Sequence, residues 1–169
     1  DAKAHAEYVC SKEEFNRILQ RFPESSYFHP SLVVPYHAGT RIGETFAIDL
    51  KEDVDFEKHE LHIRGQLVKI EKTWFIKPPK YDSYRTIKMG KTLEKVLKST
   101  LHHQNINRMK YGGKYLKTYL LPDNSITQVR SDVAVAYKEF TPLCVKDDGT
   151  FVSPDSFKYC ARVVHYELG

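Results

Sequence analysis

The sequence predicts a helix-rich α+β fold in one domain, and three features of its pattern carry that prediction. Apolar residues recur at helical spacing near both ends of the chain, strand-like alternation occupies the middle, and further extended segments follow residue 113. The 169 residues, 41% of them hydrophobic and 28% charged, have the composition of a globular domain with its own core. We find no internal boundary, so residues 1–169 are expected to form one domain with no second domain.

Helices are predicted wherever start and stop signals flank an apolar period of 3 to 4 residues. Ser11 and Glu14 match a capping box that opens a helix, and Pro23 ends it. Further helices are expected at about 30–36, 40–50 and 92–109. A last helix begins with Ser153 as N-cap and Pro154 in its first turn. Its inward-facing residues are predicted to be Phe157, Cys160, Ala161, Val164 and Leu168.

Two groups of strands are predicted between these helices. Alternation over 61–67, followed by strands at 73–77 and 84–89, indicates a three-stranded antiparallel meander whose second turn contains Pro78, Pro79, Asp82 and Ser83. Residues 114–145 are expected to form one or two hairpins, a small β insertion before the last helix.

Charge is unevenly distributed along a chain whose net charge is only +4. Residues 44–60 contain seven acidic and two basic residues, whereas residues 64–98 contain ten basic and three acidic residues. Such a basic block favours a face that binds phosphates, although a solvated lysine-rich hairpin and helix would give the same count.

The sequence has no pattern typical of a metal site or of a membrane span. The three cysteines, Cys10, Cys144 and Cys160, are far apart and show no zinc-ligand spacing, which favours a reduced, cytoplasmic setting. No apolar run of about 18 residues predicts a membrane span. We therefore expect no metal, no cofactor and no membrane partner.

The segment Gly39-Thr40-Arg41-Ile42-Gly43-Glu44 is the sharpest local feature. An arginine in the first helical turn is disfavoured by the positive end of the helix dipole, unless the site binds an anion. Glu44, three residues on, could hold the guanidinium in place. An ordinary surface pair between Arg41 and Glu44 remains the alternative interpretation.

Several motifs together resemble the catalytic domain of tyrosine recombinases, the family of phage and transposon integrases. The segment 39–44 resembles the motif of the family's first arginine, and residues 49–56 resemble the stretch after it. Residues 78–87 resemble the family's β-hairpin, and residues 148–157 resemble the lead into a late helix. The pieces follow in family order and cover nearly the whole chain, with integrases of conjugative transposons and prophages as the nearest likeness.

This resemblance implies an enzyme that cuts and rejoins DNA through a 3′-phosphotyrosine intermediate, without a metal. Arg41 matches the first phosphate-clamping arginine, Lys80 matches the hairpin lysine that acts as general acid, and Glu44 would orient Arg41. The hairpin is one residue shorter than the usual pattern, so Lys77 is an alternative to Lys80. The remaining residues expected to contact DNA are Lys72, Lys77, Arg85 and Lys88.

The family's His-x-x-Arg motif has no match in these residues, and the resemblance assigns none of the 11 tyrosines as nucleophile. The sequence is therefore expected to be the N-terminal part of the catalytic domain, incomplete at its C-terminus and inactive by itself. The implied partners are double-stranded DNA at a recombination site and other integrase subunits in a tetramer, in the bacterial cytoplasm. A non-catalytic DNA-binding relative and a plain structural or interaction domain remain the alternatives.

Overall fold

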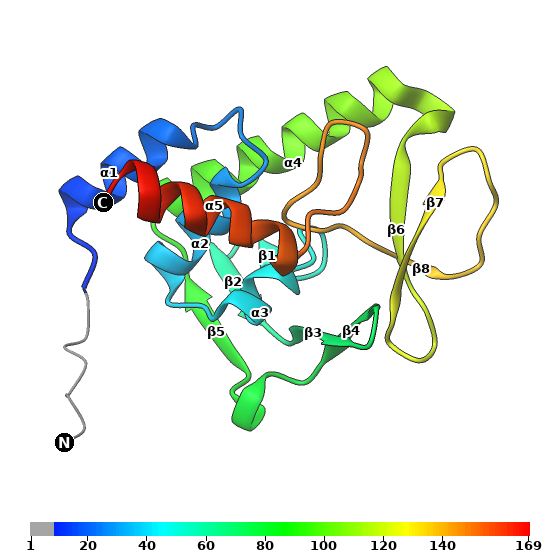
Figure 1. Cartoon of the computed structure of the whole chain (residues 1–169). Coiled ribbons are helices and arrows are strands. Elements are labelled where there is room, and N and C mark those ends of the chain that lie inside the picture. The colour runs from blue at the N-terminus through cyan, green and yellow to red at the C-terminus, as the bar shows by residue number, and fades with distance from the viewer. Residues whose placement is uncertain (1–8) are drawn as a thin grey trace.

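A computed structural model describes residues 9–169, with most helices gathered at one end and one of the three sheets at the other (Figure 1). In Figure 1, helices α1, α2 and α5 lie near one end of the long helix α4, and the sheet of β6, β7 and β8 lies at the other end. The helices are α1 (Lys12–Arg21), α2 (His29–Ala38), α3 (Ile42–Phe46), α4 (Lys91–Tyr111) and α5 (Pro154–Glu167).

Most helices begin and end where the signals in the sequence predict. The predicted capping box is present, because the Ser11 hydroxyl accepts from the Glu14 amide and the Ser11 amide donates to the Glu14 carboxylate. Helix α2 ends at Gly39, whose φ of 62° is the left-handed conformation that glycine adopts at low cost. Helix α3 is shorter than predicted and stops at Phe46, after which the chain runs irregularly to Leu50, whose amide donates to the Thr141 carbonyl.

The predicted meander is wrong in its pairing. Its first strand is two strands, β2 (Glu60–Ile63) and β3 (Gln66–Ile70), separated at Arg64 and Gly65. β3 pairs with β4 (Thr73–Lys77), and β2 pairs with β5 (Arg85–Lys88), so β4 and β5 do not pair with each other.

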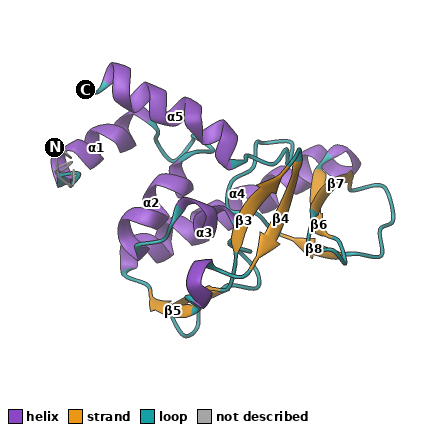
Figure 2. Cartoon of the chain, turned by 60° about the horizontal axis from the view of Figure 1, so that its bottom comes forward, coloured by secondary structure: helices purple, strands orange, loops and turns teal. Residues whose placement is uncertain are grey.

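The pairing has a geometric reason. The 60–70 segment changes partner at Arg64 and Gly65, so that β5 pairs antiparallel with its first half and β4 with its second half. Figure 2 shows β3 and β4 side by side and β5 apart from them. The three-stranded sheet that does form consists of β1 (Val54–Asp55), β2 and β5. A prolyl pair, Pro78 and Pro79, and the 3₁₀ turn η1 (Lys80–Asp82) join β4 to β5.

The small β insertion is confirmed as a second three-stranded sheet. β6 (Leu116–Leu120) is its central strand, between β7 (Ile126–Arg130) and β8 (Lys138–Phe140). Arg108 on α4 ties this sheet to the helix, since its Nη1 donates to Glu139 at 2.5 Å and its guanidinium lies 5.3 Å from the Tyr115 ring centroid.

A single hydrophobic core joins α3, the central strands, α4 and α5. Leu61 and Leu97 are fully buried in it, and Cys160 enters it from α5. The predicted inward face of α5 is wrong at Ala161, which is exposed, whereas Val163 is buried in its place. Among residues 9–169, no helix is both long and apolar enough to cross a membrane.

Candidate functional site

Arg41 occupies the N-cap of α3, where its side chain reaches the surface. Its backbone is extended, with φ −70° and ψ 158°, directly after the left-handed turn at Gly39. The Arg41 amide donates to Glu44 Oε2 at 2.9 Å and its Nη1 donates to Glu44 Oε1 at 3.1 Å. The Arg41 side chain is 54% exposed. Because α3 has only five residues, its dipole adds less positive potential than a longer helix would.

The second partner of Glu44 is Arg85, on strand β5. Arg85 Nη2 donates to Glu44 Oε2 at 2.8 Å and Nη1 donates to Oε1 at 3.1 Å, a bidentate pair. The same guanidinium donates to the carbonyls of Ser83 and Gly39, at 3.1 and 3.5 Å. Arg85, a predicted DNA contact, thus connects β5 to Glu44 in α3 and to the Gly39 carbonyl before it.

Glu44 is the buried centre of this cluster, with only 1% of its side chain exposed. The hydrogen bonds from Arg85, helped by those from Arg41, lower the pKa of Glu44 from 4.5 to about 2 in spite of its burial. The same contact raises the pKa of Arg85. The cluster therefore has two guanidinium groups, one carboxylate and a net positive charge, and Arg41 is the member that presents its charge outward.

Lys80 lies on η1, at the tip between β4 and β5, and is exposed. Its ammonium lies 5.1 Å from the Tyr81 ring centroid, and its carbonyl accepts from the Ser83 hydroxyl at 2.9 Å. Since Arg85 holds the Ser83 carbonyl, a chain of hydrogen bonds runs from the Lys80 backbone through Ser83 and Arg85 to Glu44 and Arg41. The hairpin tip is thereby tied to the Arg41 cluster.

The other predicted DNA contacts are spread along the hairpin. Lys77 ends β4, two prolines before Lys80, whereas Lys72 lies in the β3–β4 turn at the opposite end of the ribbon. Lys88 ends β5 and pairs with Glu60 at 2.8 Å, while also donating to the Lys58 carbonyl at 3.2 Å. The structure therefore groups Arg41, Glu44 and Arg85, and leaves Lys72 and Lys88 apart from them.

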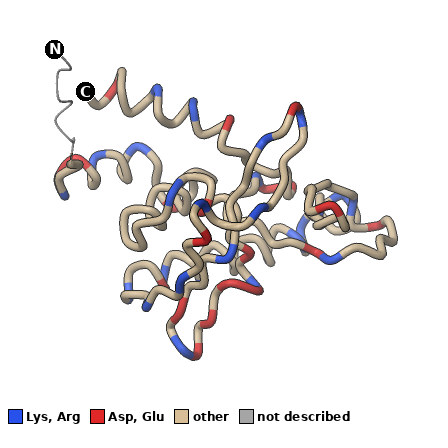
Figure 3. Tube along the Cα trace, turned by 90° about the horizontal axis from the view of Figure 1, so that it is seen from below, with Lys and Arg blue, Asp and Glu red and all other residues tan. Residues whose placement is uncertain are grey.

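The basic block of the sequence is partly neutralised in the fold. Figure 3 shows lysines and arginines interleaved with acidic residues along the trace. Within residues 64–98, half of the ten basic side chains form ion pairs, namely Arg64, Lys69, Arg85, Lys88 and Lys98. Those with no ion pair to any residue in the described range 9–169 are Lys72, Lys77, Lys80, Lys91 and Lys95. Cationic charge without an ion pair thus concentrates on the β3–β4 hairpin, the β4–β5 connection and the first turns of α4.

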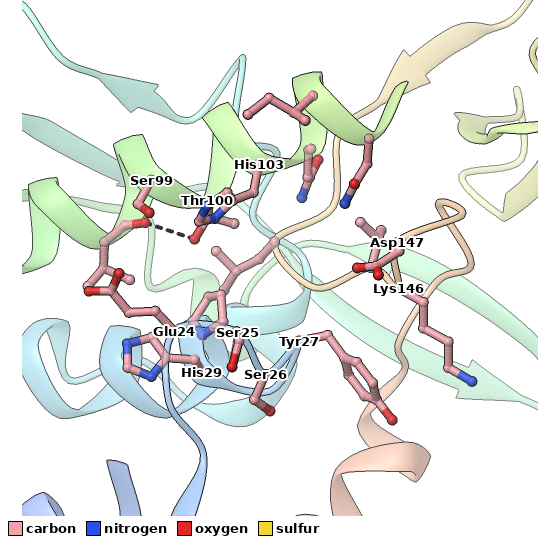
Figure 4. Close-up of a pocket in the computed structure, with 17 residues that line it drawn as sticks. Glu24, Ser25, Ser26, Tyr27, His29, Ser99, Thr100, His103, Lys146 and Asp147 are labelled. Carbon is pink, nitrogen blue, oxygen red and sulfur yellow. Dashed lines mark hydrogen bonds between the residues drawn. The ribbon is translucent and has the colours of Figure 1, made fainter. Parts of the chain in front are cut away.

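A cavity of about 410 Å³ lies away from the Arg41 cluster, between the turn before α2, one face of α4 and the turn at 145–147. Figure 4 shows Tyr27, His103, Lys146 and Asp147 around it. No residue of the Arg41 cluster lines this cavity, so the charged surface and the cavity are separate features.

Metal ligands are not grouped in the described part of the chain, where no set of three or more His, Cys, Asp or Glu side chains could hold an ion. Cys144 and Cys160 are buried in the core, and burial raises the pKa of the Cys144 thiol to about 12. Both cysteines are therefore thiols at neutral pH.

Comparison with solved structures identifies the fold as one found in DNA integrases. No protein-family model matches the sequence, and no curated protein is significantly similar to it. The chain is similar to the Tn1549 transposon integrase solved with transposon right-end DNA, with a TM-score of 0.69 and 17% identity over 99% of this chain. A second structure of that integrase, with a circular-intermediate DNA, gives a TM-score of 0.63 and 15% identity over 100% of this chain.

The likeness is one of fold at these identities, and it agrees with the family that the sequence motifs resemble. The chain spans about half of each integrase structure, 47% and 48% respectively.

Proposed function

We propose that this chain is the part of a DNA-recombining enzyme that holds the DNA phosphate to be cut and protonates its leaving 5′ oxygen. Arg41 binds the non-bridging oxygens of that phosphate, and Lys80 is the general acid for the leaving 5′ oxygen. The observation that carries the proposal is the buried Glu44, which fixes Arg41 from one side and Arg85 from the other while Arg41 stays half exposed. The motif order, and a fold shared with an integrase solved on transposon DNA, support it.

Cleavage of a DNA strand requires cations around the phosphorus that is attacked. When a tyrosine hydroxyl attacks the phosphodiester, negative charge grows on the non-bridging oxygens of a pentacoordinate phosphorus. A guanidinium suits two of these oxygens at once, better than an ammonium would. The bond from phosphorus to the 5′ oxygen breaks, and Lys80 gives that oxygen its proton. The products are a 3′-phosphotyrosine and a free 5′-hydroxyl, and the reverse attack rejoins the strand.

Two groups are proposed to lie outside these residues: the attacking tyrosine and a His-x-x-Arg motif. The chain has eight histidines, and none of them is followed three residues later by arginine. The 169 residues alone are therefore proposed to bind DNA without cutting it. The longer enzyme acts on double-stranded DNA in the bacterial cytoplasm, as an assembly of subunits on paired sites.

DNA binding by the chain tests the first half of the proposal. At low salt we expect salt-sensitive binding, because phosphate contacts release counterions. Arg41→Ala should weaken it about 10-fold and reduce the salt slope by about 0.9, the value of one phosphate contact. Arg21→Ala is the control, since it removes another exposed arginine paired with a glutamate, Glu167, on a different surface. Equal effects of the two substitutions would contradict the proposal.

Strand cleavage by the longer protein tests the second half. Arg41→Ala should abolish cleavage and leave the fold intact, because loss of one electrostatic donor costs about 10²- to 10³-fold in rate. Arg41→Lys should retain DNA binding and lose most cleavage. Lys80→Ala should be rescued by DNA with a 5′-phosphorothiolate leaving group, which needs no proton, and the same rescue of Lys77→Ala instead would move the acid to Lys77. Tight binding with no cleavage by the unsubstituted protein would favour the non-catalytic DNA-binding relative.

A further inference from the structure

The tip of the β4–β5 connection holds an aromatic side chain in a strained conformation. Tyr81 has φ 61° and ψ 30°, and Asp82 follows with φ 49°, so two consecutive residues other than glycine are left-handed. The Tyr81 side chain is 82% exposed (the tip is the green coil at the bottom of Figure 1). Strain of this kind persists only where the surrounding structure enforces it, and it concentrates at binding sites.

The surrounding structure enforces this conformation through a short network of hydrogen bonds. Pro79 precedes the turn with φ −62°, and its carbonyl accepts from the Asp82 amide at 3.0 Å. The Asp82 carbonyl accepts from the Tyr84 amide at 2.8 Å, and the Ser83 hydroxyl donates to the Lys80 carbonyl at 2.9 Å. These hydrogen bonds fix the conformation of the turn, on which Tyr81 is exposed.

The only cation near that ring is the Lys80 ammonium, 5.1 Å from its centroid, among the contacts of the described residues. A mostly exposed ring with an ammonium over it, which pairs with no carboxylate of residues 9–169, matches two parts of a nucleotide. The ring can stack on a base, and the ammonium can approach the phosphate attached to it. Bases inside an intact duplex have both faces covered by their neighbours, so stacking requires a base that has left the stack.

We propose that Tyr81 is a stacking platform for an unpaired base next to the phosphate held by Arg41. The inference rests on the proposed function and adds a ligand to it: a DNA strand that is locally opened rather than a continuous duplex. Lys80 and Tyr81 then bind adjacent parts of one nucleotide, and the strained turn sets the distance between them. Stacking is indifferent to base identity, so this contact detects opening of the helix and reads no sequence.

The negative charge of Asp82 opposes DNA binding. Its left-handed backbone conformation explains why an aspartate occupies this position. Aspartate tolerates the left-handed region better than most residues, because its short side chain can hydrogen-bond locally. Asparagine shares that tolerance without the charge. Asp82→Asn is therefore expected to keep the turn and tighten DNA binding about twofold to fivefold at low salt, as expected when a like charge is removed near phosphates.

The test compares two DNA duplexes that differ only at one position, where the fluorescent base 2-aminopurine is either paired or bulged. With the purified chain, we expect tighter binding and stronger quenching of the bulged base, since stacking quenches 2-aminopurine. Tyr81→Ala should weaken binding to the bulged duplex at least fivefold, the lower end of a base–aromatic stack, and abolish the quenching. Its effect on the paired duplex should be below twofold, and the salt slope should not change because tyrosine is uncharged.

Two further variants make the result specific. Tyr81→Phe keeps the ring and should behave as the unsubstituted chain. Tyr84→Ala removes a tyrosine that is 56% exposed on the same hairpin but is not at the tip, and it should have little effect. Equal losses for Tyr81→Ala and Tyr84→Ala, or equal losses on paired and bulged DNA, would overturn the stacking proposal.

The same titrations separate this proposal from the one beneath it. If Arg41→Ala weakens binding to both duplexes and Tyr81→Ala weakens neither, only the stacking site fails. If the unsubstituted chain binds neither duplex at low salt, both proposals fail together.

Discussion

Replacing Glu44 by glutamine tests the centre of the site, because that carboxylate holds two arginines and is almost wholly buried. A pKa lowered from 4.5 to about 2 corresponds to about 3 kcal/mol of stability at neutral pH. Water screens the Arg41 half of the cluster, since Arg41 is half exposed, so we expect about 2 to 3 kcal/mol. The contribution is complete above pH 4.5, the ordinary value, and is lost as the pH falls toward about 2.

Urea unfolding of the unsubstituted chain and of Glu44→Gln, from pH 7 down to pH 3, measures this contribution directly. The free energies of unfolding should differ by about 2 to 3 kcal/mol at pH 7, and the difference should shrink steadily below about pH 4.5. Taking the difference cancels Asp49 and Asp53, whose pKa values burial raises and which therefore favour the fold in acid. Glu52→Gln, an exposed carboxylate paired with Lys138, should cost less than about 1 kcal/mol. A difference that is near zero at pH 7, or that stays constant down to pH 3, would show that the ionised Glu44 carboxylate does not stabilise the fold in this way.

Two pairs of substitutions test the fold around the site. Gly149→Ala should destabilise by more than about 2 kcal/mol, because φ is 88° and a Cβ would lie 2.2 Å from the Leu116 carbonyl oxygen. Gly90→Ala meets nothing within 4 Å and should change stability by less than about 1 kcal/mol, and thermal unfolding of the two variants compares them. Leu97→Ala, at a fully buried position of α4, should cost about 2 to 5 kcal/mol by urea unfolding. Met109→Ala on the same helix is 78% exposed and should cost less than about 1 kcal/mol, so similar losses would contradict the placement of α4 in the core.

Local chemistry explains why the helices could be predicted and the strand pairing could not. Ser11 and Glu14 contain the whole capping box within four residues, so the start of α1 follows from the sequence alone. Whether β4 pairs with β5 depends instead on how the 60–70 segment divides between two partners. Gly65 lies at the point of division, and β4 approaches it closely, since a Cβ there would come 2.9 Å from Ile76 Cγ2. Alternation of apolar residues describes a strand's faces, and it leaves the strand's neighbours open.

Within the site, too, the contact between neighbours in the sequence could be predicted, and the contact between distant residues could not. The Arg41–Glu44 pair was predicted, because three residues separate its members in one helical turn. The pairing of Arg85 with Glu44 was not predicted, because it spans 41 residues and depends on strand β5 lying beside the start of α3. No local signal marks that contact. The roles of Lys72, Lys77, Lys80, Arg85 and Lys88 toward DNA stay predictions.

A structure of the chain bound to DNA would show whether Arg41 and Lys80 act on one DNA phosphate. We predict a phosphate whose non-bridging oxygens lie about 2.7 to 3.2 Å from the Arg41 guanidinium, with the Lys80 ammonium reaching the 5′ oxygen of that same phosphate. Arg41 and Lys80 bound to two separate phosphates, or DNA lying on another surface of the molecule, would contradict the account.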